Sequence, residues 1–283
     1  MLGGVTLLTH PLVRRKFASP VPPGSGWPDD PASASTPVAA SADDVRRLAL
    51  VDDLGELDAR VSVCSACPRL VAWREQVAEQ KRASFADQPY WGRPIAGWGD
   101  EHPAVLIVGL APAANGGNRT GRVFTGDSSG DWLFASLHRV GLAVQPTSVH
   151  AGDGQRLISA RMVAAVRCAP PDNKPTIEER ETCAPWLERE VSLVQDSVRA
   201  VVCLGSFGWD ATLRTLRATG WTVPRPKPRF GHAAEVVVTS PAGRAATVLG
   251  SYHPSQQNTF TGRLTEPMLD AVLGRAAALA VEG

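Results

Sequence analysis

Residues 104–140 decide the fold of this chain and read AVLIVGLAPAANGGNRTGRVFTGDSSGDWLFASLHRV. The first seven residues form a continuous apolar run, which is typical of a strand buried on both faces. A long glycine-rich loop follows over residues 111–130, and residues 131–140 have the spacing of a helix. A buried strand that leads through a loop into a helix is the repeating unit of α/β folds with a parallel sheet.

The same pattern recurs towards the C-terminus. Apolar runs at 158–166 (ISARMVAAV) and 199–204 predict two more buried strands, and residues 236–250 predict a pair of strands around a PAG turn. Helices are predicted from Thr176, where Thr176 and Glu179 form a capping box, after Leu204 to about Ala218, and over 266–281. The chain is therefore expected to form an α/β sandwich around a mostly parallel sheet. Polar loops follow the strands and are expected to meet at the carboxyl edge of that sheet.

The first 40 residues differ from the rest of the chain. They are rich in Pro, Gly, Ser and Ala and show no periodicity, which predicts an extended or partly disordered tail, with Phe17 and Trp27 as anchors. From Ser41 the apolar residues recur at helical spacing up to Val61, and a second helical stretch runs through about Arg82. Residues 41–283 are expected to form a single domain.

Composition excludes several classes of protein. The chain has 283 residues, of which 43% are hydrophobic and 20% charged, so it can bury a sizeable core. There is no apolar run of 18 residues, and the first eight residues lack the basic start of a secretory signal. A formal net charge of +1 excludes a strongly basic coat for nucleic acid but leaves room for a local basic patch.

Four of the five cysteines have a spacing that indicates a metal site. Cys64 and Cys67 form a C-x-x-C between two predicted helices, and Cys168 and Cys183 form a looser second pair. Four thiolates suit either zinc or an iron–sulfur cluster, and the loose second pair favours a [4Fe–4S] cluster modestly. Because all four ligands are protein side chains, the site is expected to be structural. Cys203 lies in a predicted strand and is expected to be a core residue.

Three polar segments carry the candidate chemistry: residues 109–133, CAPPDNKP (168–175) and SYHPSQQNTFTGR (251–263). None contains a P-loop, a dinucleotide-binding fingerprint or a nucleophile elbow. Taken singly, Asp127 could be a helix N-cap and His253 a packed core residue. Together the segments offer the Asp127 carboxylate, the Asn173 amide, the His253 imidazole and the aromatic face of Phe124. They also offer several cations, which are Arg119, Arg122, Lys174 and Arg263.

These segments, with the four cysteines, resemble the uracil-DNA glycosylase superfamily over about residues 60 to 280. The resemblance is to its iron–sulfur branch, family 5 or type b, whose members act on double-stranded DNA. Family 4 carries a Glu-x-Pro-Gly version of the first motif, which this chain lacks. The chain departs from many members at Asn115, where they have histidine.

The resemblance implies a three-layer α/β/α sandwich with a central, mostly parallel four-stranded sheet, and a [4Fe–4S] cluster held by Cys64, Cys67, Cys168 and Cys183. It implies that Phe124 stacks on a flipped base, that Asp127 positions water, that Asn173 is an active-site amide, and that His253 faces uracil O2. Backbone amides around Gly109, Leu110 and Ala111 would line the base pocket. Arg119, Arg122, Lys174 and Arg263 are expected to hold DNA phosphates.

The expected activity is that of a monofunctional glycosylase that releases uracil from double-stranded DNA and initiates base excision repair. Hypoxanthine and ethenocytosine are further candidate substrates. No lysine is evident as a Schiff-base nucleophile, since Lys174 is the only one inside a motif. The protein is expected to be a cytoplasmic, nucleoid-associated monomer with no membrane partner. The alternatives are a noncatalytic, metal-stabilised nucleic-acid-binding module and an iron–sulfur redox protein.

Overall fold

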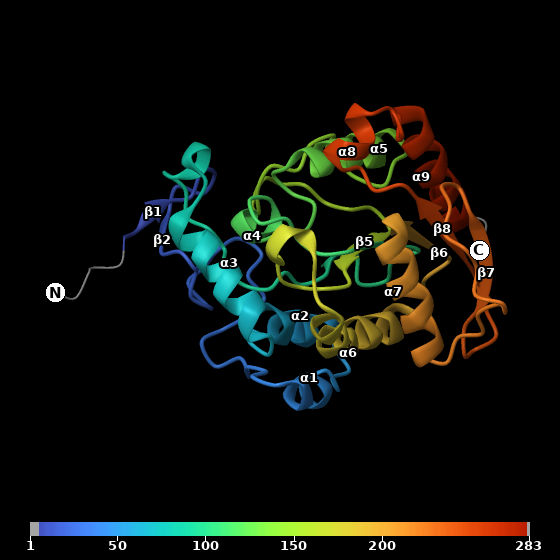
Figure 1. The fold of residues 1–283 in the computed structure, drawn as a ribbon, viewed down its shortest axis with the longest axis horizontal. Coiled ribbons are helices and arrows are strands. Elements are labelled where there is room, and N and C mark those ends of the chain that lie inside the picture. The colour runs from blue at the N-terminus through green and yellow to red at the C-terminus, as the bar shows by residue number, and fades with distance from the viewer. Residues whose placement is uncertain (1–5, 282–283) are drawn as a thin grey trace.

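The computed structural model describes residues 6–281 of the chain, and a six-stranded sheet lies at the centre of the fold (Figure 1). The strand order is β3-β5-β4-β6-β8-β7, with bounds β3 (Trp98–Gly99), β4 (Val105–Gly109), β5 (Ala160–Ala164), β6 (Ala200–Leu204), β7 (Glu235–Thr239) and β8 (Ala245–Ser251). The inner four strands are parallel, and β3 and β7 pair antiparallel at the two edges. The predicted four-stranded parallel sheet is thus present, but the sheet is larger than expected. The two-residue β3 is too short to show any periodicity, and β7 forms a hairpin with β8.

The central strand β4 is buried along its whole length, as its apolar run predicts. Ile107 of β4 lies opposite Met162 of β5 on one side and Val202 of β6 on the other. These residues flank β4 within the sheet, and helices bury both of its faces, so the parallel centre of the sheet is also the centre of the core.

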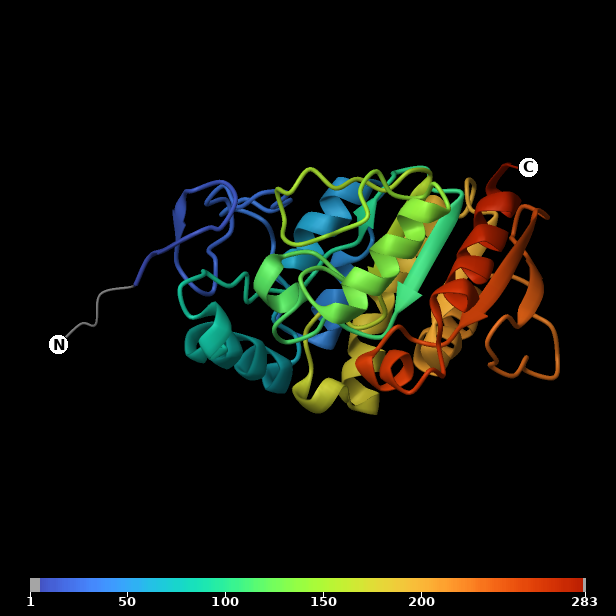
Figure 2. The same cartoon turned by 90° about the horizontal axis from the view of Figure 1, so that it is seen from above.

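Helices cover both faces of the sheet, which confirms the three-layer α/β/α architecture (Figures 1 and 2). Leu133 of α5 and Leu273 of α9 belong to the core on one face, and Leu187 of α6 and Leu213 of α7 to the core on the other. The helix bounds are α1 (Ala42–Leu48), α2 (Leu54–Ser62), α3 (Pro68–Gln80), α4 (Gly117–Thr120), α5 (Ser128–Arg139), α6 (Ile177–Val194), α7 (Gly205–Ala218), α8 (Gln256–Phe260) and α9 (Glu266–Val281), with short 3-10 turns at Ala83–Phe85 and Pro171–Asn173. In the described part of the chain, no helix combines the length and apolar character needed to cross a membrane.

Side-chain caps set several helix starts. Thr176 and Glu179 form the predicted capping box at the start of α6. The single helix expected from Ser41 to Val61 is wrong, because the chain breaks and restarts as α2. The Asp53 carboxylate accepts a hydrogen bond from the Glu56 backbone N–H at 2.7 Å and so supplies a new N-cap there. The loop predicted over 111–130 also contains the one-turn helix α4.

A buried ion network ties β5 to two helices. The Glu190 carboxylate of α6 is fully buried and accepts hydrogen bonds from Arg161 and Arg167, each at 2.5 Å. Arg161 also binds Asp58 of α2 at 2.7 Å. Burial alone would raise the pKa of Glu190, but the two guanidinium groups hold it below its ordinary value. Gly97 is required beside this network, because a Cβ there would overlap the Glu190 carboxylate.

The strand order places a topological switch point between β4 and β6. From β4 the chain passes to β5 on one side and then to β6 and β8 on the other. In open α/β sheets the crevice at the carboxyl ends of such strands is the usual ligand site. The loops after β4, β6 and β8 therefore border one crevice, as the sequence pattern predicts.

The N-terminal segment lies at one end of the molecule, opposite β7 (Figure 2). From residue 6 to 40 it is mostly irregular, with a two-residue hairpin formed by β1 (Leu8–Thr9) and β2 (Lys16–Phe17). Phe17 and Trp27 are 3% and 2% exposed and so anchor it, and Asp30 forms a buried ion pair with Arg93 at 2.9 Å. Residues 1–5, which belong to the expected tail, and residues 282–283 lie outside the described residues.

His10 of this segment packs against His150. The rings of His10 and His150 are 4.1 Å apart between centroids, and both residues are buried. Burial lowers the pKa of His10 to about 4 and that of His150 to about 3. Neither ring nitrogen of His150 has a hydrogen-bond partner among the described residues.

We expect His150→Leu to weaken the acid sensitivity of folding. The unfolded histidine has its ordinary pKa and the folded one a lowered pKa, so its stabilising effect is complete above about pH 6.5 and is lost as pH falls below that value. In this window each such histidine raises the unfolding constant up to about tenfold per pH unit. Urea unfolding between about pH 6 and pH 4.5 should show a shallower pH dependence for the variant than for wild type. His102→Leu, at an exposed position, is the control. An unchanged slope in His150→Leu would contradict the prediction.

Candidate active site

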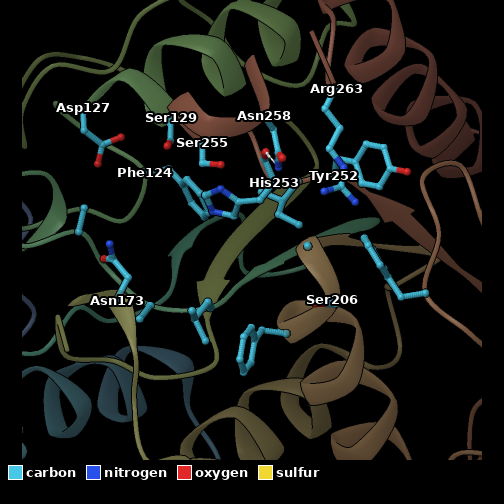
Figure 3. A pocket seen from close by; sticks show the side chains of 17 residues that line it. Phe124, Asp127, Ser129, Asn173, Ser206, Tyr252, His253, Ser255, Asn258 and Arg263 are labelled. Carbon is cyan, nitrogen blue, oxygen red and sulfur yellow. Dashed lines mark hydrogen bonds between the residues drawn. The ribbon is translucent and has the colours of Figure 1, made fainter. Parts of the chain in front are cut away.

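A cavity of about 400 Å³ opens at the switch point. Figure 3 shows its side chains, with Phe124 and His253 at the centre, Asp127 and Ser129 along one side and Asn173 opposite. The wall combines residues from the segments after β4, β5, β6 and β8 with Phe230, from the loop between α7 and β7. They are Leu110, Ala111, Ala113, Phe124, Asp127, Ser129, Asn173, Leu204, Gly205, Ser206, Phe207, Phe230, Tyr252, His253, Ser255, Asn258 and Arg263.

Phe124 forms the aromatic face of the cavity. Its ring is packed so closely on Gly109, at the end of β4, that a Cβ on Gly109 would lie 2.6 Å from the ring. Gly109 therefore has to be glycine for the ring to sit where it does. The backbone of Phe124 has φ 49°, an uncommon conformation for a non-glycine residue, and its surroundings must hold it there. Leu110 and Ala111 follow β4 directly and line the cavity beside this ring.

Asp127 has a structural role and also faces the cavity. One carboxylate oxygen accepts a hydrogen bond from the Gly130 backbone N–H at 3.0 Å and caps α5. Its second oxygen lies against Gly116, where any Cβ would collide with it. Burial raises the pKa of Asp127 above its ordinary value. The capping hydrogen bond therefore orients the Asp127 carboxylate, which is largely shielded from solvent.

His253 stands beside Phe124, with the ring centroids 5.7 Å apart. Its backbone carbonyl accepts a hydrogen bond from the Asn258 side chain at 2.9 Å, which ties the residue to α8. Burial lowers the pKa of His253 to about 4, so the imidazole is neutral at physiological pH. Neither ring nitrogen is hydrogen-bonded to another residue in the described range, so the ring can donate to a ligand.

Asn173 reaches the cavity from the opposite wall. It ends the 3-10 turn Pro171–Asn173, where Asp172 and Asn173 have φ of 53° and 56°. Asparagine and aspartate tolerate this left-handed conformation better than most residues. The turn presents the amide to the cavity without a helix or strand behind it.

Several cavity residues were not identified from the sequence. Ser206 and Phe207 begin α7, directly after β6, and Tyr252 directly follows β8, so their place after buried strands was an available signal. Phe230 comes from the proline-rich loop between α7 and β7, and no local pattern indicated that this loop folds back on the site.

The structure corrects the role expected for two arginines. Arg119 and Arg122 are 5% and 2% exposed. Arg119 donates to the Asn115 and Gly126 carbonyls and to Gln88, and Arg122 pairs with Asp153 at 2.6 Å. Their guanidinium groups hold the glycine-rich loop together and are not free to contact phosphates. Asn115 itself accepts a hydrogen bond from the Tyr90 hydroxyl at 2.9 Å.

Lys174 and Arg263 are placed differently. Both are exposed beside the cavity, and Arg263 also lines it. The Arg263 guanidinium lies 4.6 Å from the centre of the Tyr252 ring, which holds it at the rim (Figure 3). These two cations are available to an anion in solution.

Cys64, Cys67, Cys168 and Cys183 line one small cavity between the start of α3, the end of β5 and α6. The thiols are free, and burial raises the pKa of Cys64 and Cys183 and raises that of Cys67 to about 12. No group of three or more His, Cys, Asp or Glu side chains within residues 6–281 is placed to hold a metal ion. Cys203 is separate from this site, since it is buried in β6 as expected.

A buried cation accompanies the four thiols. Arg74 is 4% exposed, and its Nη1 donates to the Cys168 sulfur and to the Cys64 carbonyl, each at 3.0 Å. Its Nε has no partner, and the nearest carboxylate, Glu75, is 3.9 Å away. A buried charge without a close carboxylate is costly unless it has another anionic partner. The cavity therefore fits a metal-containing group whose binding converts the four thiols to thiolates, which would be anionic partners for Arg74.

Known proteins are similar to this chain in sequence. The model of the uracil DNA glycosylase superfamily matches residues 96–276. A type-5 uracil-DNA glycosylase of Mycobacterium bovis is 57% identical over 272 residues, which cover 96% of this chain and 98% of that protein. The type-5 enzyme of Thermus thermophilus is 48% identical over 78% of the chain and 95% of its own length. A type-4 uracil-DNA glycosylase of Archaeoglobus fulgidus is more distant, at 26% identity over 57% of the chain and 70% of that protein. The family model and these alignments show that the chain belongs to the uracil-DNA glycosylase superfamily and is more similar to the proteins named type 5 than to that type-4 protein.

Proposed function

We propose that this protein is a monofunctional uracil-DNA glycosylase that hydrolyses the N-glycosidic bond of uracil in double-stranded DNA and so initiates base excision repair. The observation that carries the proposal is the convergence of Phe124, Asp127, Asn173 and His253 on one cavity at the switch point of the sheet. The near full-length similarity to proteins named type-5 uracil-DNA glycosylase supports it.

The base must leave the duplex to reach these residues, because the cavity is enclosed by side chains on several sides. Flipping costs a few kcal/mol and is easiest at a mismatch, so uracil opposite guanine is the favoured substrate. Stacking on Phe124 returns about 1–3 kcal/mol. The exposed Phe260 of α8 lies on the loop that we expect to press into the duplex.

Bond cleavage places negative charge on the departing uracil and positive charge on the sugar. A neutral His253 is suited to donate a hydrogen bond to uracil O2, with backbone amides near Leu110 and Ala111 adding further donors. One carboxylate oxygen of Asp127 accepts from Gly130, and we expect the other to accept a hydrogen bond from a water. We infer that it orients that water and offsets the charge of the sugar, while Asn173 holds the base from the opposite wall.

The cavity has room beyond a single pyrimidine ring, at about 400 Å³. This supports hypoxanthine and ethenocytosine as additional substrates. None of the residues that line the cavity is a lysine, which supports hydrolysis by water without a Schiff base. We further propose that Lys174 and Arg263 contact phosphates, and that the protein acts as a monomer on nucleoid DNA in the cytoplasm.

We also propose that Cys64, Cys67, Cys168 and Cys183 hold a [4Fe–4S] cluster. The shared cavity of the four thiols and the buried charge of Arg74 beside Cys168 support an anionic group there. When bound, the cluster supplies a structural link with four protein ligands. Arg74 offsets the thiolate charge and fixes the Cys168 sulfur, next to the segment that leads to Asn173.

The proposal is tested by base release from a duplex with one uracil opposite guanine. Parallel duplexes carry hypoxanthine or ethenocytosine, and each product is analysed with and without alkali. We expect strand cleavage only after alkali and no covalent adduct after borohydride treatment, because no lysine lines the cavity. A borohydride-trapped adduct would contradict the hydrolytic mechanism. Binding of DNA without release of any of the three bases would favour the noncatalytic binding module.

Asp127→Asn should separate catalysis from capping. The amide oxygen can still accept the Gly130 N–H, since asparagine is as good an N-cap as aspartate, so stability should stay close to wild type. Loss of the charge should lower the single-turnover rate of uracil release by about 10²–10⁴-fold, the usual contribution of such a group. Asp53→Asn changes the equivalent cap of α2, away from the cavity, and should leave the rate unchanged. Equal effects of the two substitutions on the rate of uracil release would contradict the catalytic assignment of Asp127.

Cys64→Ser should remove the cluster, whereas Cys203→Ser should retain it. Cys64 lines the four-thiol cavity and Cys203 lies in β6, where its thiol contacts Thr212 at 3.3 Å. The readouts are iron and acid-labile sulfide per chain, visible absorbance and the thermal midpoint. We expect the absorbance and the sulfide to disappear only in Cys64→Ser, together with a lower midpoint. One zinc and no sulfide in the wild-type protein would replace the cluster with a zinc site.

A further inference from the structure

A second cavity, of about 350 Å³, lies beside the base pocket along α7. Leu110 and Phe207 line both cavities, so the two share a rim. The floor of the second cavity consists of small or apolar residues that include Ala165, Val166 and Ala211. Of the three polar segments, only the first reaches this surface, through Leu110, and the proline-rich loop at residues 224–232 contributes Lys227.

The walls of this cavity are basic. Arg180 comes from α6, Arg214 and Arg217 from α7, and Lys227 from the proline-rich loop, whereas Asp210 is the one carboxylate among the lining residues. We call these four cations the basic groove. The whole chain has a formal charge of only +1, so four cations against one carboxylate are a strong local concentration of charge.

These cations are only weakly used by the fold. Arg214 is exposed and has no ion pair or hydrogen bond to another residue in the described chain. Lys227 pairs with Asp210 at 2.6 Å, but the two side chains are 51% and 58% exposed, and such a surface pair yields readily to a competing anion. Arg217 donates to the Pro224 carbonyl at 3.4 Å. This contrasts with Arg119 and Arg122, whose donors are committed inside the protein.

The cavity residues that α7 contributes form a line along the helix. Residues 207, 210 or 211, 214 and 217 recur at three- and four-residue spacing, which places them on one side of α7. A rise of 1.5 Å per residue puts Arg214 about 10 Å along the helix from Phe207 at the pocket rim. B-form DNA rises about 3.4 Å per step on each strand, so Phe207 and Arg214 are separated by roughly three nucleotide steps, and Arg217 lies about one step further.

We propose that the basic groove binds the phosphodiester backbone of the DNA that flanks the nucleotide held in the base pocket. The inference rests on the proposed function, because it places the DNA on one side of the target nucleotide along α7. Arginine and lysine contacts to phosphates supply affinity that is independent of sequence and position the duplex without taking part in the chemistry. Pro224, Pro226 and Pro228 restrict the backbone around Lys227, which lowers the entropy lost on binding.

The test compares the variant Arg214→Gln/Arg217→Gln with Arg46→Gln/Arg47→Gln. The second pair lies on α1, is 61% and 67% exposed, and changes the net charge by the same amount. The probe is a duplex with one tetrahydrofuran abasic-site analogue opposite guanine, and its dissociation constant is measured by fluorescence anisotropy over about 50–200 mM KCl. Arg214→Glu is a further variant at a single exposed position, so it should fold normally.

We expect the groove variant to bind about tenfold more weakly at the lowest salt, and its slope of log K against log[KCl] to be shallower by about 1 to 2, close to one unit per lost phosphate contact. Arg214→Glu should weaken binding in the same direction, and the α1 variant should match wild type. The single-turnover rate of uracil release at saturating enzyme should stay within about twofold of wild type, because the groove acts before the chemistry.

Each other outcome has a definite meaning. Affinity and slope equal to those of the α1 variant would overturn the groove, whatever the activity. Loss of uracil release at saturating enzyme with unchanged binding would also overturn it, because the arginines would then act in the cavity. A third outcome is that the wild-type protein releases no uracil, while the groove variant still binds DNA more weakly and with a shallower salt dependence than wild type. The proposed function then fails, and the groove remains a DNA-binding surface.

Discussion

The buried carboxylate of Glu190 is the constraint on which the arrangement of the site depends. It joins Arg161 and Arg167, at the two ends of β5 and its extension, to α6, and Asp58 adds α2 through Arg161. Removing one partner from such a network leaves an uncompensated buried charge, which typically costs about 3–5 kcal/mol. Arg167 directly precedes Cys168, and Asn173 follows Cys168 by five residues, so the network also positions the second pair of cysteines and one wall of the cavity at the switch point.

The arginines of this chain include buried ones whose donors bind within the protein and exposed ones such as Arg214 and Arg263, and only the structure separates the two kinds. Arg74, Arg119, Arg122, Arg161 and Arg167 are all buried, and each donates to a carbonyl, a carboxylate or a sulfur. Arg214 and Arg263 are exposed. A motif shows where a cation occurs in the sequence, but the partner of each donor depends on segments distant in the chain. Asp153, the partner of Arg122, lies 31 residues away.

Sequence patterns predicted the parallel core, both helical layers and the polar residues at the carboxyl edge, because buried strands and capped helices leave local signals. The Thr176 capping box and the apolar run of β4 are examples. The rest depends on contacts that no local pattern contains. The two-residue β3 exists only through its pairing with β5, the break before α2 depends on one carboxylate, and Phe230 reaches the cavity by a fold-back of its loop. Resemblance supplied the roles of Phe124, Asp127 and His253; the geometry adds why Gly109 and Gly116 must accompany them.

The separate origin of the cavity walls has an evolutionary consequence. Phe124 and Asp127 belong to the segment after β4, whereas Phe230 belongs to the loop between α7 and β7, which carries none of the polar residues assigned to bond cleavage. Under the proposed function, insertions, deletions or exchanges of residues in that loop would alter the size of the base that fits the cavity, while Phe124 and Asp127 keep their places. Under that function, selection would widen or narrow the range of accepted bases through one surface loop and leave the segment after β4 unchanged.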